Sequence, residues 1–190
     1  MNTLHFPANK MSIRARAIGI IKERSFREGN FTLASGKPSK YYLDMKPTML
    51  HSEGASLLAK LVLDKLHSVN ADCVGGLEMG AVPLISPIAM LSNETRKPIQ
   101  GFFVRKTVKD HGTMKKIEGI ENFKGRRVAI LDDVMTTGGS AMEAVRAIRD
   151  AGGEIVLVLS IVDREEGAKE FYEKEGLPFE ALFTAKEFMI

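Results

Sequence analysis

The stretch RRVAILDDVMTTGGSAMEAV, residues 126–145, decides the fold. Its apolar run at 128–131 is short and bounded by charged residues, which is typical of a buried parallel strand. From Ala141 apolar side chains recur at helical spacing as far as Ile148, and glycines at 152–153 end the pattern. We therefore predict a strand, a polar turn and a helix. In an open α/β sheet such a turn lies at the carboxyl edge, where ligands bind.

The turn combines two kinds of chemistry. Glycines and hydroxyl groups next to the N–H groups of a helix start suit a phosphate. The residues concerned are Thr136, Thr137, Gly138, Gly139 and Ser140. Asp132 and Asp133 would repel a phosphate, so we expect them to accept hydrogen bonds from a sugar diol or to face a hydrated divalent cation. The two needs together describe a ribose 5-phosphate.

Other phosphate motifs do not fit this turn. It lacks the lysine of a Walker loop and the three-glycine dinucleotide fingerprint. The plain alternative is a polar bend with solvated carboxylates. The run as a whole resembles the phosphoribosyl-diphosphate (PRPP) signature of type I phosphoribosyltransferases, which does not name the nucleobase.

Length and composition suit one compact domain. The chain has 190 residues and a net charge of +3, which is too small to argue for a nucleic-acid partner. Its one cysteine, Cys73, excludes an internal disulfide framework and favours a reducing compartment. No apolar run approaches the roughly 20 residues of a membrane span, and the N-terminal stretch lacks the apolar region of a signal peptide. We expect a cytoplasmic protein with no membrane partner.

Strand and helix patterns alternate along most of the chain. This predicts an α/β fold with a central, mostly parallel sheet flanked by helices. The expected strands lie at 72–75, 101–104, 128–131, 154–163 and 179–183, and the expected helices near 52–66, 84–91, 141–148 and 165–174. A helix at 12–26 and a strand pair within 31–44 fall outside this alternation. We expect a single domain over 1–190, with residues 1–50 forming a cap over the carboxyl edge of a core at 51–190.

Three further segments follow expected core strands. In GGLEMGAVP (75–83), three glycines and an alanine around Glu78 and Met79 suit a backbone that wraps an anion, or a tight turn into a helix. RKTVKDHGTMKKIEG (105–119) is long and basic, as in a mobile lid, although a solvated charged loop would also fit. Arg164 ends the strand at 154–163, where it could bind a planar carboxylate or pair with a neighbouring glutamate.

Together these segments resemble the orotate phosphoribosyltransferase family over nearly the whole chain. GNFTLASGKPSKYYLD (29–44) is similar to that family's N-terminal signature, and RKTVKDHG (105–112) to its mobile catalytic loop. The resemblance implies transfer of ribose 5-phosphate from PRPP to N1 of orotate, with Mg²⁺ required. It also implies a homodimer in which the lid reaches the neighbouring subunit's active site.

The resemblance assigns a role to each candidate residue. Lys106, Lys109, His111, Arg105 and Asp133 are the catalytic candidates. PRPP would be held by Asp132, Asp133, Thr136, Thr137, Gly138, Gly139, Ser140, Glu78, Met79 and Gly80. Orotate would contact Arg164, Thr136, Phe31, Tyr41 and Tyr42. Mg²⁺ would arrive with PRPP, with Asp132 and Asp133 as the candidate protein ligands. The sequence does not distinguish proton transfer by His111 from phosphate binding.

Two positions depart from the family pattern. Ala34 and Gly80 stand where some members have a lysine. Lys37 or Lys46 could reach the space that the lysine at position 34 occupies in those members. Two rival functions stay open at this point. One is the same chemistry on a purine or on uracil, against which Arg164 argues because those bases carry no carboxylate. The other is a PRPP-sensing regulator that binds nucleic acid, against which the modest charge and the absence of an additional domain argue.

Overall fold

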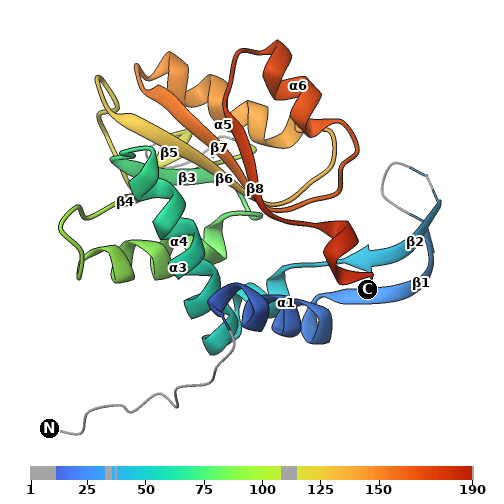
Figure 1. Ribbon diagram of the computed structural model, residues 1–190. Coiled ribbons are helices and arrows are strands. Elements are labelled where there is room, and N and C mark those ends of the chain that lie inside the picture. Colours follow the sequence, from blue (N-terminus) through green and yellow to red (C-terminus); the bar gives the residue numbers. More distant parts are fainter. Residues whose placement is uncertain (1–11, 33–35, 37, 108–114, 190) are drawn as a thin grey trace, which may run out of the picture.

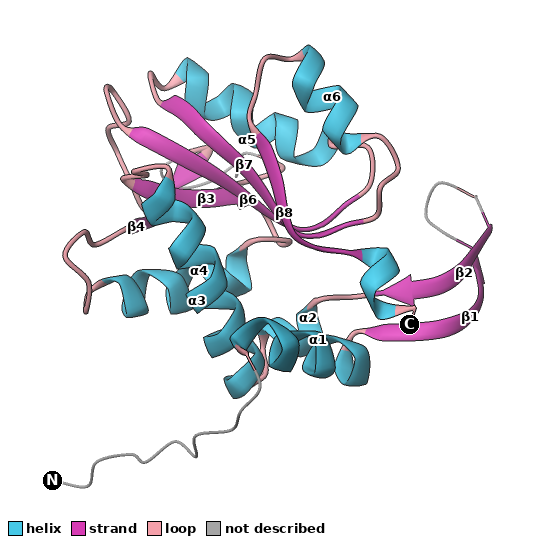
Figure 2. Ribbon diagram, viewed as in Figure 1, coloured by secondary structure: helices cyan, strands magenta, loops and turns pink. Residues whose placement is uncertain are grey.

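The computed structural model describes residues 12–32, 36, 38–107 and 115–189. Within them a central sheet has the strand order β5-β4-β3-β6-β7-β8, parallel except at β5, and helices cover both of its faces (Figures 1 and 2). Its strands are β3 (Cys73–Leu77), β4 (Gln100–Val104), β5 (Ile117–Glu118), β6 (Arg127–Met135), β7 (Glu154–Asp163) and β8 (Phe179–Thr184). The described helices are α1 (Ile13–Arg24), α2 (Lys46–Met49), α3 (Ser52–Ser68), α4 (Val82–Ser92), α5 (Gly139–Asp150) and α6 (Ala168–Lys174), with a 3₁₀ turn η1 (Ala185–Phe188). The predicted α/β architecture is confirmed.

The alternation of side chains along β6 divides the core into two layers. Val128 and Ile130 pack in the cluster that contains α5 and α6, whereas Ala129 and Leu131 pack in the cluster that contains α3 and α4. All four side chains are at most 1% exposed. Because helices cover both faces, the strand needs a continuous apolar run rather than alternating polarity.

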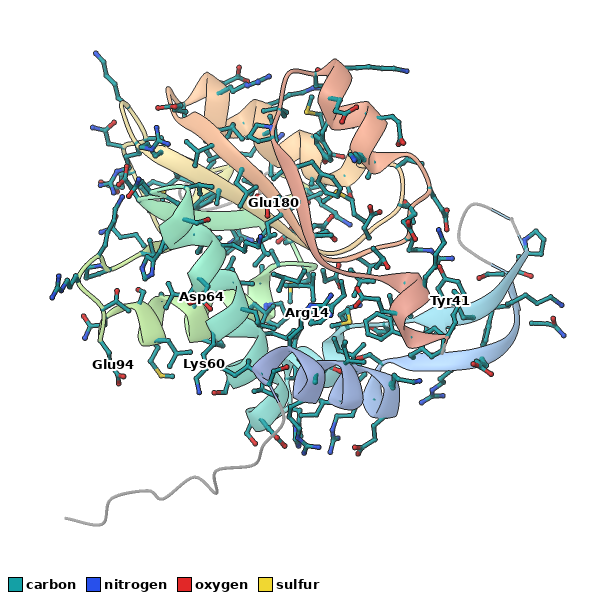
Figure 3. All side chains as sticks on the ribbon, viewed as in Figure 1. Arg14, Tyr41, Lys60, Asp64, Glu94 and Glu180 are labelled. Atoms are coloured by element: carbon teal, nitrogen blue, oxygen red, sulfur yellow. The ribbon has the colours of Figure 1, made fainter. Side chains whose placement is uncertain are left out.

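The N-terminal elements are joined to the body of the molecule by a shared core. The antiparallel hairpin β1 (Phe26–Thr32) and β2 (Pro38–Leu43) forms a separate two-stranded sheet beyond the carboxyl ends of the parallel strands (Figure 1). Phe26 packs against Phe188 of η1, with ring centroids 6.0 Å apart. Arg14 of α1, which is labelled in Figure 3, donates to the carbonyl oxygen of Leu182 at 3.2 Å and to Glu187 at 2.9 Å. The cap is therefore attached to the last strand and to η1.

Two local expectations were wrong. Strand β6 continues to Met135, because its pairing with β7 extends to Met135 opposite Asp163, so the two carboxylates lie in the strand and not in the turn. Helix α6 begins at Ala168 rather than near 165, because Glu165 and Gly167 have positive φ angles of 58° and 110°. Within the segment at 105–119, Ile117 and Glu118 form β5, which pairs with β4.

None of the described helices has the length and apolar character needed to cross a membrane.

Candidate active site

Asp132 and Asp133 lie side by side near the carboxyl end of β6. Asp132 is 7% exposed; its Oδ1 accepts the N–H of Asp133 and its Oδ2 accepts the hydroxyl of Ser140, both at 3.1 Å. Oδ1 of Asp133 accepts the N–H of Val134 at 2.9 Å. These donors hold both carboxylates in defined positions at the wall of a cavity.

Burial changes the acidity of this pair. Loss of solvation raises the pKa of Asp132 to about 7, and the negative charge of Asp133 adds to the effect. Loss of solvation also raises the pKa of Asp133, while the hydrogen bond from Val134 and the charge of Lys46 act in the opposite direction. A buried carboxylate beside a half-buried one favours a bound group that brings hydrogen-bond donors or positive charge.

The loop after β3 packs directly on the two carboxylates. A Cβ atom on Gly80 would lie 2.4 Å from Oδ1 of Asp132 and 2.8 Å from Oδ1 of Asp133, so only glycine fits this arrangement. Glu78 Oε1 accepts the N–H of Lys106 at 2.9 Å, which ties this loop to the end of β4. Met79 is 57% exposed. A lysine at position 80, as in some family members, would therefore require a different loop conformation.

The first two glycines of GGLEMGAVP do not belong to the loop. Gly75 and Gly76 lie within β3, where a Cβ would fall 2.2 Å from the carbonyl oxygen of Phe102 and 2.0 Å from that of Leu131. Close packing in the sheet explains both glycines, so the expectation that all three glycines wrap an anion was wrong for these two.

The turn between β6 and α5 is held by a buried tyrosine. Gly138 has a φ of 86° and precedes α5, whereas Gly139 is helical and needs no positive φ. The Tyr172 hydroxyl donates to the carbonyl oxygen of Gly138 at 2.6 Å. A Cβ on Gly138 would lie 2.8 Å from the Tyr172 ring and 2.9 Å from the Phe171 ring. Conformation and packing both require glycine here, and the N–H groups at the start of α5 are available to an anion.

The basic segment after β4 is anchored at both described ends. The N–H of Arg105 donates to the carbonyl oxygen of Lys116 at 2.9 Å, and the Arg105 guanidinium pairs with Glu118 at 3.1 Å. Lys106 lines the cavity beside the carboxylates. Lys109 and His111 lie outside the described residues.

A cavity of about 510 Å³ brings these parts together. It is lined by side chains from α2, β6 and the loops that follow β3 and β4. The lining residues are Lys46, Leu77, Glu78, Met79, Gly80, Lys106, Asp132, Asp133, Val134 and Ser140. Carboxylates and cations thus face one space, which suits a polyanion that also carries hydroxyl groups.

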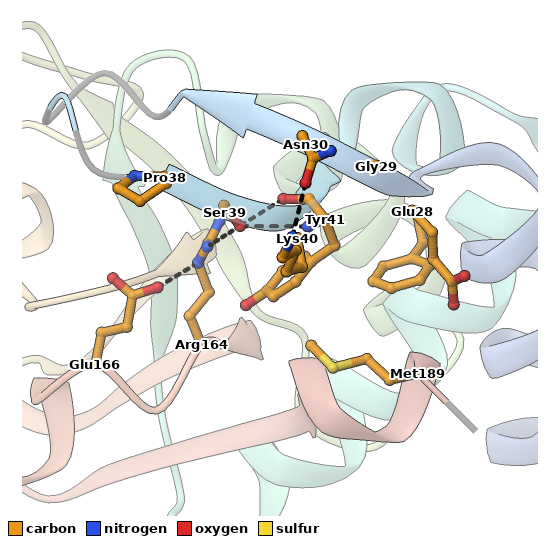
Figure 4. A pocket seen from close by; sticks show the side chains of 11 residues that line it. Glu28, Gly29, Asn30, Pro38, Ser39, Lys40, Tyr41, Arg164, Glu166 and Met189 are labelled. Atoms are coloured by element: carbon orange, nitrogen blue, oxygen red, sulfur yellow. Dashed lines mark hydrogen bonds and ion pairs between the residues drawn. The ribbon is translucent and has the colours of Figure 1, made fainter.

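A second cavity of about 920 Å³ lies between the hairpin and the end of β7 (Figure 4). Arg164 has a side chain only 7% exposed; its Nε pairs with Glu166 at 2.7 Å and its guanidinium lies over the Tyr41 ring, 4.5 Å from the centroid. Arg164 also donates to the Ser39 hydroxyl at 3.3 Å. Its own N–H donates to the carbonyl oxygen of Met135 at 2.9 Å, so the arginine is attached beside the turn that begins at Thr136.

The expected orotate residues are only partly brought together. Tyr41 and Arg164 line the larger cavity, whereas Phe31 and Tyr42 pack on each other with ring centroids 5.6 Å apart and are not among its lining residues. Thr136 is half-buried and lies next in sequence to Met135.

Sequence reasoning missed Tyr172 and Ser39, whereas Glu166 is one of the neighbouring glutamates that were expected as alternative partners of Arg164. Tyr172 had no local signal, because its hydrogen bond joins α6 to the turn before α5, which is 34 residues away in sequence. Ser39 carried a weak signal, since it lies two residues from the predicted site residue Tyr41.

Comparison with known proteins gives one consistent family. Residues 48–184 match the phosphoribosyl transferase domain. The chain is 53% identical over 184 residues to orotate phosphoribosyltransferase from Rhodopseudomonas palustris (strain BisB18), covering 95% of this chain and 98% of that protein. The crystal structure of Mycobacterium tuberculosis H37Rv orotate phosphoribosyltransferase with Fe(III) dicitrate is similar, with a TM-score of 0.82, 35% identity, and coverage of 94% and 100%. The same enzyme in complex with PRPP gives a TM-score of 0.78, 33% identity, and coverage of 94% and 100%.

Proposed function

The chain belongs to the orotate phosphoribosyltransferase family, and we propose that it transfers the ribose 5-phosphate group of PRPP to N1 of orotate. The bond from ribose C1 to the diphosphate oxygen breaks, the bond from C1 to N1 forms, and pyrophosphate and orotidine 5′-monophosphate are released. The observation that carries the choice of base is the buried Arg164, which stacks on Tyr41 and is attached to the strand end before Thr136. A guanidinium in this position suits the carboxylate of orotate.

In this proposal the β6 strand and the turn after it hold the ribose 5-phosphate. Asp132 and Asp133 accept hydrogen bonds from the ribose hydroxyls, and residues 136–140 with the start of α5 hold the 5′-phosphate. The hydrogen bond from Ser140 to Asp132 supports a fixed spacing between the two subsites. Pre-positioned groups reduce the entropic cost of bringing the reactants together.

The leaving diphosphate belongs to the smaller cavity. Negative charge develops on it as the C1 bond breaks, and Lys106, Lys109 and His111 are proposed to stabilise that charge. Arg105 is paired with Glu118, which supports a role in fixing the base of the lid segment. Closure of this segment would exclude water, which would otherwise hydrolyse PRPP.

Orotate is proposed to lie in the larger cavity against Tyr41. Glu166 occupies one edge of the Arg164 guanidinium. The remaining N–H groups of Arg164 can then bind a second carboxylate, that of orotate. Phe31 and Tyr42 stay as candidate contacts of the hairpin. Orotate supplies its own nucleophilic nitrogen, so the mechanism requires no covalent protein nucleophile.

Mg²⁺ is the cofactor in this proposal. Among the described residues no three His, Cys, Asp or Glu side chains gather into a metal cage, whereas Asp132 and Asp133 face the diphosphate cavity. Mg²⁺ commonly keeps several waters and binds through one or two carboxylates and substrate phosphates, so this donor set fits. When bound, the ion would neutralise charge on the diphosphate.

We also propose a homodimer in the cytoplasm. Helix α4 carries no charged residue, and its Met90 is 69% exposed, which supports contact with a second copy. The buried free thiol of Cys73 suits a reducing compartment. In the dimer, lid residues of one subunit would reach the partner's site.

The test is absorbance near the orotate band, with purified protein, PRPP and Mg²⁺. Parallel reactions contain orotate, uracil, hypoxanthine or xanthine. We expect absorbance to fall only in the reaction that contains orotate. The fall should require both PRPP and metal. Turnover with another base and not with orotate would contradict the role of Arg164, and no turnover with any base would favour the regulator.

A further inference from the structure

Lys46 is a cation in the smaller cavity for which the reaction outlined above has no use. It is the first residue of α2, and its side chain is 54% exposed. Its Nζ donates to Oδ1 of Asp44 at 3.0 Å, and its backbone N–H donates to the same oxygen at 3.1 Å. An ammonium group has three donors, so two remain for a ligand.

The surroundings of this ammonium group define the ligand. Lys46 lines the cavity together with Glu78, Asp132 and Asp133, and Lys106 is the other cation among its described lining residues. The positive charge of Lys46 acts on Asp133, so the ammonium group lies on the carboxylate side of the cavity. A polyanion entering beside three carboxylates needs positive charge from more than one direction. Lys106 follows β4, whereas Lys46 comes from α2, so the two lysines approach from different elements.

We propose that Lys46 is a further catalytic residue, whose ammonium group binds the diphosphate of PRPP and stabilises it as it leaves. This inference rests on the proposed function. The proposal places the two anionic groups of PRPP in separate subsites. The 5′-phosphate belongs to the turn at 136–140, and of this turn only Ser140 is among the described residues that line the smaller cavity beside Lys46. Lys46 should therefore affect pyrophosphate and not ribose 5-phosphate.

The chain offers a matched control. Lys97 pairs with Asp72 at 3.0 Å, as Lys46 pairs with Asp44, and the side-chain exposures are similar at 40% and 35% against 54% and 30%. Asp72 directly precedes β3, at the opposite end of the sheet from the active site. Lys97→Gln therefore removes a comparable surface ion pair, together with a hydrogen bond to the carbonyl oxygen of Asn70, without touching the cavity.

The experiment compares wild type, Lys46→Gln, Lys46→Arg and Lys97→Gln. Loss of one charge-assisted contact predicts that Lys46→Gln lowers kcat/KM for PRPP by about 10- to 100-fold, with KM for orotate unchanged. Calorimetry should show weaker binding of magnesium pyrophosphate and unaltered binding of ribose 5-phosphate. Lys46→Arg should recover most of the loss, and Lys97→Gln should match wild type.

Other results would overturn the inference. Unchanged pyrophosphate binding in Lys46→Gln would remove the diphosphate contact, even if PRPP use fell. Equal losses for pyrophosphate and ribose 5-phosphate would assign Lys46 to general positioning. Pyrophosphate binding needs no orotate turnover, so the inference can fail or stand separately from the choice of base.

Discussion

Replacing Asp132 by asparagine is expected to stabilise the ligand-free protein at pH 8 while impairing its use of PRPP. The side chain is 7% exposed, and burial raises its pKa from an ordinary value near 3.8 to about 7. Each pH unit between the two values corresponds to about 1.4 kcal/mol. The roughly three units therefore set an upper bound of about 4 kcal/mol on the cost of keeping the ionised carboxylate in the folded state.

The direction in which the free energy of unfolding changes with pH follows from proton binding. Between the unfolded and folded pKa values the folded protein binds more protons, so its free energy of unfolding falls as the pH rises through that window. Asparagine carries no charge and avoids this loss. The gain from Asp132→Asn should be about 2–4 kcal/mol at pH 8, about 2 kcal/mol at pH 5.5, and close to zero near pH 4. The asparagine can still accept the N–H of Asp133, and the Ser140 hydroxyl can reverse its role.

Urea unfolding of the ligand-free protein at these three pH values measures the effect. Asp72→Asn is the control. The hydrogen bond from the N–H of Arg127 lowers the pKa of Asp72, so replacing this ionised carboxylate should destabilise the protein at pH 8. The same preparation of Asp132→Asn should show kcat/KM for PRPP reduced at least about tenfold, as a lost contact to a ribose hydroxyl requires. A destabilised Asp132→Asn, or a stability difference that does not change between pH 4 and pH 8, would refute this reasoning.

Three further substitutions test other parts of the site. Tyr172→Phe removes the shorter of two hydrogen bonds to the carbonyl oxygen of Gly138, which keeps the N–H of Met142 at 3.3 Å, so we expect a loss of about 0.5–1.5 kcal/mol in urea unfolding and a raised KM for PRPP, with KM for orotate unchanged. Gly80→Ala places a Cβ 2.4 Å from a carboxylate oxygen and should lower kcat/KM for PRPP by about 10- to 100-fold. Gly19→Ala, whose Cβ meets nothing within 4 Å, should leave kcat/KM unchanged. Equal kcat/KM values for the two variants would show that the loop adapts freely. Lys109→Ala should lower kcat more than it weakens orotate binding, and an unaltered kcat in rapid-mixing assays would exclude a catalytic lid.

Local sequence signals were sufficient for the architecture and for several residues that line the smaller cavity. The apolar run at 128–131 needed no tertiary information to be identified as a buried strand, because a parallel sheet covered on both faces requires such a run. The strand at 154–163 was located to the residue, since it is long, β-branched-rich and bounded by charge. The carboxyl ends of such strands meet at one edge of the sheet, which is why Asp133 and Lys106 could be placed together in advance.

Signals that depend on partners distant in sequence were not available. Asp132 and Asp133 belong to a strand only because β7 continues alongside them, and a pair of carboxylates has no strand propensity of its own. The close packing that explains Gly75 and Gly76 comes from neighbouring strands, so glycine spacing alone could not distinguish it from an anion loop. The face of the hairpin on which each aromatic residue lies depends on the register shift between Glu28 and Phe31, which the sequence did not indicate.

The geometry around the carboxylates explains why the sheet tolerates them. A buried carboxylate beside a half-buried one should lower the stability of the ligand-free protein at neutral pH, and Gly80, Ser140 and Val134 hold the pair in place rather than neutralise it. A ligand that brings hydroxyl donors and a hydrated cation would relieve that cost on binding. The instability of the empty site is therefore a source of affinity for the ribose and its metal. On this argument, substitutions that stabilise the free protein at Asp132 should weaken PRPP binding, and the two effects should arise from the same carboxylate.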